Sequence, residues 1–179
     1  MTDTSIRSHQ ESVTVAASAA ELYDLVSDIT RTGEWSPVCA GCWWDEGTEA
    51  GVGVGVGPAR VGAWFTGRNE LPHRSWETRS QVVVAERGRE FAWVVGGTLV
   101  RWGFTMAPVV DGSGTVLTES WAFLPDGIAM FKDKFGDDAQ VQIADRTQQA
   151  LQGIPVTLRA IQRIAETSPG SVGGEVVRS

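Results

Sequence analysis

Six strand-like segments follow one another between Cys39 and Leu124, and this run constrains the fold more than any other feature of the chain. β-branched and aromatic residues are common in the segments, and turn residues such as Gly, Pro and Asp separate them. From residue 60 onward the links hold only two to seven residues, too few for helical crossovers, which favours an antiparallel sheet. The predicted strands are 39–45, 60–70, 74–85, 90–96, 99–107 and 115–124.

A strand at 11–15 and then helical sequence precede this run. The segment Ser18–Glu21 has the form of a capping box, in which two side chains satisfy free amides at a helix start. Gly33 interrupts the helical pattern and Pro37 ends it, because the residue before a proline disfavours helical geometry. The apolar residues between them recur at spacings of three and four and predict one buried helix face: Leu22, Leu25, Val26 and Ile29.

One long helix is predicted after the strands, over residues 137–167. A helix of this length would span about 45 Å, enough to lie across a whole sheet. Pro155 removes the amide that would bond to Leu151, so we expect a kink there or a break into two helices. The apolar face recurs every three or four residues: Ile143, Thr147, Leu151, Ile154, Leu158, Ile161 and Ala165.

The chain shows no internal repeat and no long linker, which predicts a single domain over residues 10–167. The polar segment 1–9 and the Gly- and Ser-rich segment 168–179 are predicted to be flexible tails. The glycine-rich segment 47–59 is predicted to be a flexible loop that covers a pocket mouth. Its spacing does not match G-x-G-x-x-G and no helix start follows, so we do not expect it to bind phosphate.

Charge and composition exclude several classes of function. The net charge of −7 and the absence of a basic run argue against a nucleic-acid partner. No apolar stretch is long enough for a membrane span, the polar start does not resemble a signal peptide, and two cysteines do not form a disulfide framework. We therefore expect a cytoplasmic protein. Eight tryptophans against one tyrosine indicate a large core, an aromatic pocket or both.

Three stretches carry a resemblance to a known family: Ala16–Pro37 (AASAAELYDLVSDITRTGEWSP), Val61–Asn69 (VGAWFTGRN) and Thr115–Trp121 (TVLTESW). With the order of elements, they resemble the bacterial polyketide cyclase/dehydratase-like branch of the SRPBCC superfamily, over residues 11–166. The resemblance implies an α+β helix-grip fold. In this fold a curved antiparallel sheet of about seven strands wraps around a long C-terminal helix, with two short helices after the first strand. It also implies a ligand cavity between sheet and helix.

Strand alternation predicts which side chains face that helix. Core packing would explain each aromatic ring alone, but four inward tryptophans are more aromatic bulk than a sheet and one helix usually need to fill a core. Their number therefore favours a pocket. Arg68 is included because a guanidinium near the cavity could hold an enolate or carboxylate, as could Arg101, although most strand arginines face solvent. We expect a hydrophobic or aromatic small molecule to contact Trp35, Phe65, Arg68, Asn69, Trp76, Ser80, Trp93, Trp102, Phe104 and Trp121.

Glu119 is the candidate catalytic residue. It shares strand parity with Leu117, Trp121 and Phe123, so it is predicted to face the cavity, where burial would raise its pKa toward the range useful for acid–base chemistry. The alternatives are a one-residue error in the face assignment, which would put Glu119 in solvent, or a salt bridge with an arginine.

Cys39 and Cys42 have the C-x-x-C spacing of redox and zinc sites. Two residues three apart on a strand point to opposite faces, and neither a second pair nor a nearby histidine follows in the sequence. We therefore expect two half-buried small side chains without metal or redox function, and we expect no metal and no cofactor in the protein.

Two functions remain open at this point. One is a carrier or binding module that holds a hydrophobic small molecule, and the other is a cofactor-free polyketide cyclase, aromatase or dehydratase that uses polar cavity residues as acid and base. A third hypothesis is a purely structural or regulatory domain. The sequence is compatible with a homodimer.

Overall fold

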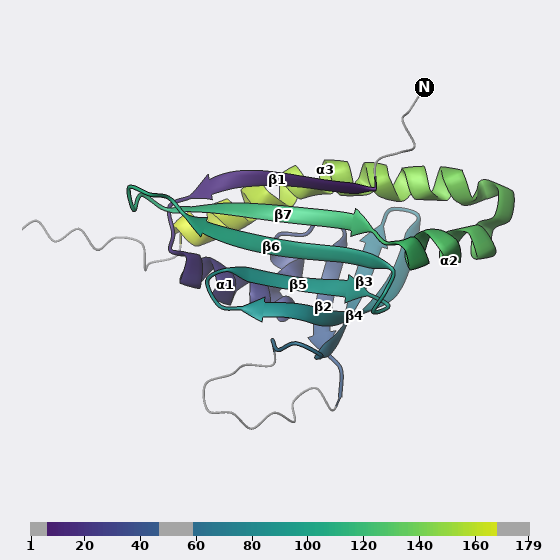
Figure 1. Cartoon of the computed structure of the whole chain (residues 1–179), viewed down its shortest axis with the longest axis horizontal. Coiled ribbons are helices and arrows are strands. Elements are labelled where there is room, and N and C mark those ends of the chain that lie inside the picture. The colour runs from purple at the N-terminus through teal and green to yellow at the C-terminus, as the bar shows by residue number, and fades with distance from the viewer. Residues whose placement is uncertain (1–6, 47–58, 168–179) are drawn as a thin grey trace, which may run out of the picture.

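A seven-stranded antiparallel sheet forms the centre of the computed structural model, which describes residues 7–46 and 59–167. The strand order is β1-β7-β6-β5-β4-β3-β2, so β1 and β2 are the two edges (Figure 1). The strands are β1 (Ser8–Val15), β2 (Cys39–Trp44), β3 (Trp64–Leu71), β4 (Arg74–Glu86), β5 (Glu90–Val95), β6 (Val100–Pro108) and β7 (Thr115–Phe123). The helices are α1 (Ala19–Ser27), η1 (Ile29–Glu34), α2 (Pro125–Phe135), η2 (Gly136–Asp138) and α3 (Ala139–Thr167). All six strands of the predicted run are confirmed.

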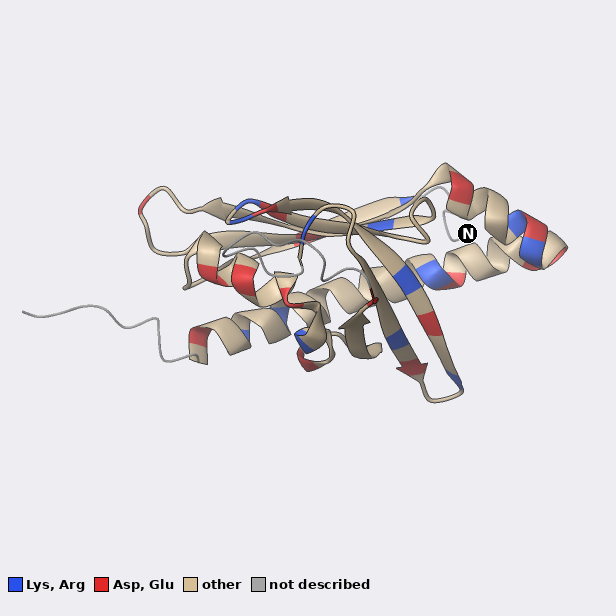
Figure 2. Cartoon of the chain, turned by 90° about the horizontal axis from the view of Figure 1, so that it is seen from below, with Lys and Arg blue, Asp and Glu red and all other residues tan. Residues whose placement is uncertain are grey.

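The sheet is curved, and its second half bends toward the long helix. Figure 2 shows the β3–β4 hairpin leaving the plane of the other strands on the side where α3 lies. The pairing of β4 with β5 shifts register between Val82 and Val84, and such a bulge increases the local bend and twist of a strand. The sheet therefore has a concave face, which α3 approaches.

Helix α3 crosses the concave side as one continuous helix of 29 residues. It continues through Pro155, so the alternative of two separate helices is wrong. Its contacts with the sheet are mainly with β1 and β7, and it also packs against α1 and α2. Its buried residues lie on one face: Ala139, Ile143, Ala150, Ile154, Thr157, Leu158, Ala160 and Ile161. Of the seven positions that the periodicity predicted, Ile143, Ile154, Leu158 and Ile161 are buried, whereas Thr147, Leu151 and Ala165 are half-buried.

The capping box at the start of α1 is confirmed. The Glu21 amide donates to Ser18 Oγ at 3.2 Å, and the Ser18 amide donates to Glu21 Oε2 at 2.9 Å. The second short helix, η1, is a 3₁₀ helix that packs on β2, so the predicted pair of short helices is present. Helix α1 contacts β5 and β6.

Helix α2, which links β7 to α3, was not predicted from the sequence. Pro125 occupies its first turn, where the missing amide costs no hydrogen bond. Gly127 lets the helix approach the turn after β5 so closely that an added Cβ would lie 2.2 Å from the Leu99 carbonyl oxygen. The Phe131 ring packs edge-on against Phe123, with ring centroids 5.1 Å apart. Helix α2 thus extends the apolar side of the sheet beyond its end.

Several predictions fall on residues that the structure does not describe. The loop at 47–59 lies almost wholly outside the described residues, as do the tail at 168–179 and most of segment 1–9. Strand β1 begins at Ser8, three residues before its predicted start at Glu11. Within the described ranges, none of the helices combines the length and the apolar character that a membrane span requires.

Candidate ligand-binding site

Aromatic side chains form a connected row across the concave face. The row runs from β2 to β6 through Trp44, Phe65, Trp93 and Phe104, with successive ring centroids 5.7, 6.1 and 6.0 Å apart. Tilted and edge-on contacts at these separations are favourable for aromatic pairs. A second row leads from Trp102 through Trp121 and Phe123 to Phe131 of α2.

The strand register puts most of the predicted site residues on this face. Trp93, Trp102 and Trp121 lie directly opposite one another on three adjacent strands, and Phe104 lies opposite Glu119. Directly opposed residues of antiparallel strands point to the same face. Phe65 is paired with Ser80 and Asn69 with Trp76 in the other half of the sheet. Trp35, at the end of η1, is buried in the core.

The tryptophans in the middle of this face are not fully covered. Trp93 is half-buried although β5 is the central strand, whereas its ring neighbours Phe65 and Phe104 are buried. Trp102 on the next strand is also half-buried. Because α3 packs mainly on β1 and β7, it leaves the middle strands less covered. The exposed parts of these indoles therefore form apolar surface inside the concave face.

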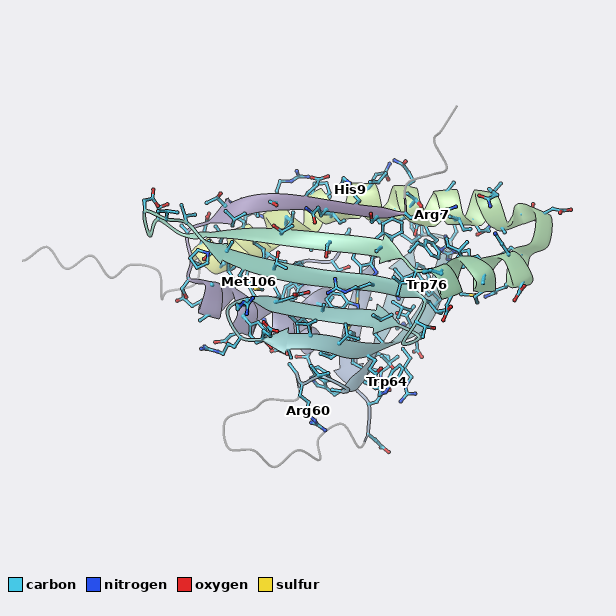
Figure 3. The ribbon with its side chains drawn as sticks, in the orientation of Figure 1. Arg7, His9, Arg60, Trp64, Trp76 and Met106 are labelled. Atoms are coloured by element: carbon cyan, nitrogen blue, oxygen red, sulfur yellow. The ribbon has the colours of Figure 1, made fainter. Side chains whose placement is uncertain are left out.

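The far end of the concave face carries positive charge. Trp76 lies toward the α2 end of the sheet, whereas Met106 lies toward α1 (Figure 3). The Arg74 guanidinium stacks 4.2 Å from the centre of the Trp76 ring. Partial burial, and then the charge of Arg74, lower the pKa of Arg146 on α3. Arg74 and Arg146 thus lie close enough for their charges to interact, and Arg146 also forms an ion pair with Asp145. The cations of this group would attract an anionic group of a ligand.

Hydrogen bonds hold Asn69 in this part of the concave face. Its Nδ2 donates to Thr78 Oγ1 at 3.2 Å and to the Gly67 carbonyl oxygen at 3.4 Å. Its carbonyl oxygen has the acceptor capacity that a hydroxyl group of a ligand would need.

Arg68 does not belong to the concave face, which corrects its inclusion among the predicted ligand contacts. It lies between Gly67 and Asn69, whose side of β3 faces inward, and strand alternation therefore turns it outward. Its side chain is 56% exposed and pairs with Glu70 at 2.9 Å. Arg101 likewise lies beside Trp102 on the opposite face and bonds to Glu90 on β5 at 2.5 Å.

Glu119 is the buried acid of the site. It is 5% exposed, and its Oε2 has no hydrogen-bond partner among the described residues. Desolvation by burial raises the pKa of its carboxyl to about 8. At neutral pH the group is therefore mainly a neutral acid that can donate one proton, and its carboxylate form is within reach. The alternatives of a solvent-facing or salt-bridged Glu119 are both wrong.

His9 and Glu11 were missed as neighbours of this acid. Glu11 lies directly opposite Glu119 across the β1–β7 pair, and His9 lies opposite Trp121. The His9 Nε2 lies 2.9 Å from Glu11 Oε1, and both side chains are partly exposed. Figure 3 shows His9 on the edge strand β1. The alternating burial of β1, with Val13 and Val15 on the same face, was the available signal. Two polar side chains of the edge strand are therefore the cross-strand neighbours of Glu119 and Trp121.

The two cysteines contradict the prediction that they point to opposite faces. The Cys39 and Cys42 Sγ atoms lie 3.2 Å apart, because a register shift between Cys39 and Gly41 puts both on the inner side of β2. Both are free thiols and both are half-buried, the latter as predicted.

Two of the surface hollows formed by the described residues lie outside the concave face. One, of about 430 Å³, is formed mainly by outward residues of β1, β6 and β7 such as Gln10, Arg101 and Ser120. The other, of about 470 Å³, lies between Arg7 and the side of α2 that carries Ile128 and Lys132. Neither is lined by Trp93 or Glu119. The enclosed internal cavity that the resemblance implies stays a prediction.

Comparison with solved structures supports the helix-grip architecture. The polyketide cyclase-like protein Cgl2372 from Corynebacterium glutamicum is 49% identical, with 94% of this chain and 97% of that chain covered and a TM-score of 0.63. A START superfamily protein from Mycobacterium smegmatis is 19% identical, with coverages of 90% and 98% and a TM-score of 0.56. The di-domain aromatase/cyclase StfQ of the steffimycin pathway is 15% identical, with coverages of 91% and 51% and a TM-score of 0.64.

A comparison with curated proteins gave no significant match. The family model described as "Polyketide cyclase / dehydrase and lipid transport" matches residues 7–155, which include every strand of the sheet and most of α3. The chain therefore belongs to this polyketide cyclase/dehydrase and lipid-transport family of helix-grip proteins.

Proposed function

We propose that the protein binds a small hydrophobic or aromatic molecule against the concave face of its sheet, as a carrier or binding module. The observation that carries this proposal is the incomplete burial of Trp93 and Trp102 in the middle of the sheet. Flat indole surface in an apolar recess favours flat apolar ligands, and a few polar groups would orient them. Asn69, Glu119 and the cations Arg74 and Arg146 are the polar groups in reach of such a ligand.

A direct test is titration of the protein with a fluorescent naphthalene sulfonate and with neutral polycyclic aromatics, following quenching of tryptophan emission. We expect a dissociation constant in the micromolar range, about 8 kcal/mol of binding free energy. Trp93→Phe should weaken binding about fivefold, which corresponds to about 1 kcal/mol of lost aromatic contact. Trp43→Phe is the matched control, because Trp43 is an exposed indole on β2. Equal affinities of the two variants would contradict the proposed site.

A second candidate function is a cofactor-free cyclase, aromatase or dehydratase acting on a polyketide-like chain. It is favoured by the buried Glu119 carboxyl, whose Oε2 lacks a partner among the described residues. The carboxylate would take a proton from a carbon next to a carbonyl, and the resulting acid would return it to a hydroxyl that leaves as water. The family description names enzymes as well as lipid transport, so it supports either candidate.

Glu119→Gln separates the two candidates because it keeps the size of the side chain and removes its proton transfer. The assay uses a poly-β-ketone thioester analogue as substrate. If the protein is an enzyme, Glu119→Gln should bind the analogue but form no aromatic product. Glu77→Gln, which changes an exposed glutamate of β4, should leave turnover unchanged. If the wild-type protein binds the analogue and forms no product, the carrier reading stands and the enzyme reading is refuted.

A further inference from the structure

Cys39 and Cys42 form a close thiol pair outside the proposed ligand contacts. Three positions of β2 span two positions of β3 here, because Cys39 pairs with Asn69 and Cys42 with Gly67. Asn69 and Gly67 both face inward, so the bulge turns both thiols to the same side. The Sγ atoms lie 3.2 Å apart, about 1.2 Å more than in a disulfide bond.

The surroundings leave room for this pair and keep it reachable. A Cβ added at Gly67 would lie 3.2 Å from Cys42 Sγ and 3.8 Å from Cys39 Sγ, so the missing side chain makes the space that the sulfurs occupy. Both cysteines are half-buried, on an edge strand of the sheet. Within residues 7–46 and 59–167 no third His, Cys, Asp or Glu joins them to make a metal-binding group. The geometry suits two-electron thiol chemistry better than metal coordination.

The two thiols are not equivalent. The hydrogen bond with Cys42 lowers the pKa of the Cys39 thiol, against an opposing effect of burial. The same hydrogen bond and burial raise the pKa of Cys42 far above its ordinary range. Because the thiolate is the nucleophile in disulfide exchange, Cys39 is the sulfur that attacks first.

We propose that Cys39 and Cys42 are a dithiol–disulfide couple that exchanges with a low-molecular-weight disulfide. The Cys39 thiolate attacks one sulfur of that disulfide, and a mixed disulfide forms as the other half leaves as a thiolate. The departing thiolate accepts the Cys42 proton. The Cys42 sulfur then attacks Cys39 Sγ and expels the second small thiol. One dithiol and one small disulfide thus become one protein disulfide and two small thiols.

The test uses the folded full-length chain in mixtures of oxidised and reduced glutathione, with acid quenching, alkylation and intact mass measurement. We expect the wild-type chain to lose two hydrogen atoms in mass and to regain them with dithiothreitol. Cys42→Ser should accumulate a glutathione adduct on Cys39, about tenfold faster than Cys39→Ser acquires one on Cys42. Circular dichroism checks that both variants are folded.

Two results would overturn the proposal. One is that, in a single redox buffer, the wild-type chain forms the disulfide when unfolded in urea but stays a dithiol when folded. The other is equal rates of adduct formation in the two serine variants. If either variant fails to fold, peptide mapping of wild-type samples quenched early must find the mixed disulfide on Cys39, and its presence on Cys42 instead would refute the assigned order.

Discussion

Replacing Glu119 by Gln should remove a pH dependence of stability that the wild-type protein carries. Burial raises the pKa of Glu119 to about 8, whereas a glutamate in an unfolded chain titrates near its ordinary value of about 4.3. Between these values the folded protein holds a proton that the unfolded chain has released. The free energy of unfolding therefore falls as the pH rises. The stabilising contribution is complete below the unfolded pKa and is lost once the pH passes the folded pKa.

The size of the effect follows from the same shift. Each pH unit between the two pKa values changes the free energy of unfolding by about 1.4 kcal/mol, so about three units, from pH 5 to pH 8, give an upper value of about 4 kcal/mol. Water penetration and relaxation around the charged form reduce this, and we expect about 2–4 kcal/mol. Urea unfolding followed by tryptophan fluorescence at several pH values measures it in the wild-type protein and in Glu119→Gln.

The comparison needs a control, because stability can depend on pH through groups other than Glu119. All of those groups are present in the wild type and in Glu119→Gln, so their effect cancels in the difference between the curves. Glu77→Gln removes an exposed glutamate and should leave the slope of the wild type unchanged. If the curves of the wild type and Glu119→Gln run parallel from pH 5 to pH 8, about the range between the two pKa values, the burial argument for Glu119 is refuted.

Substitutions at three further positions test the packing, at Ser18 and Phe91 by the same unfolding assay and at Gly127 by hydrogen exchange. Ser18→Ala removes the side-chain cap of α1 and should lower the free energy of unfolding by about 1 kcal/mol, whereas Ser18→Gly should cost less. Gly127→Ala puts a Cβ 2.2 Å from the Leu99 carbonyl oxygen, so α2 must shift, and increased hydrogen exchange confined to α2 would show it. Phe91→Ala empties a fully buried position and should cost about 3–5 kcal/mol, while a loss below 1 kcal/mol, about that of a surface change, would contradict the core assignment.

The alternation of apolar and polar residues predicted the strands and their inward faces because the inner face of the sheet is buried, whereas the outer face is largely solvated apart from Ala92 and Val94 on β5. On β7, for example, every second residue from Thr115 to Phe123 is buried. The same rule predicted the burial of Glu119, since it shares the parity of Leu117 and Trp121. Arg68 was included for its nearness to aromatic residues in sequence, although alternation already turned it outward.

Features that depend on irregular backbone could not be predicted in this way. The meeting of Cys39 and Cys42 depends on one extra residue in β2, which no residue type signals reliably. Helix α2 is short and contains Gly127, whose low helix propensity makes the helix hard to predict from the sequence. In the structure Gly127 allows the close approach of α2 to Leu99. Pro125 and the acidic Asp126 in the first turn were the local signs of the start of α2.

The attachment of β1 has a consequence for how the chain is made. Gln162 Nε2 donates to the Thr14 carbonyl oxygen at 2.9 Å, and the Ala16 amide donates to Glu166 Oε1 at 3.1 Å, across 148 and 150 residues of sequence. The strand partner of β1 is β7, which is also distant in sequence. During synthesis β1 leaves the ribosome early but finds both partners only after β7 and α3 have emerged. The first strand of the sheet is therefore the last to gain its neighbours, and its pairing should set the pace of folding.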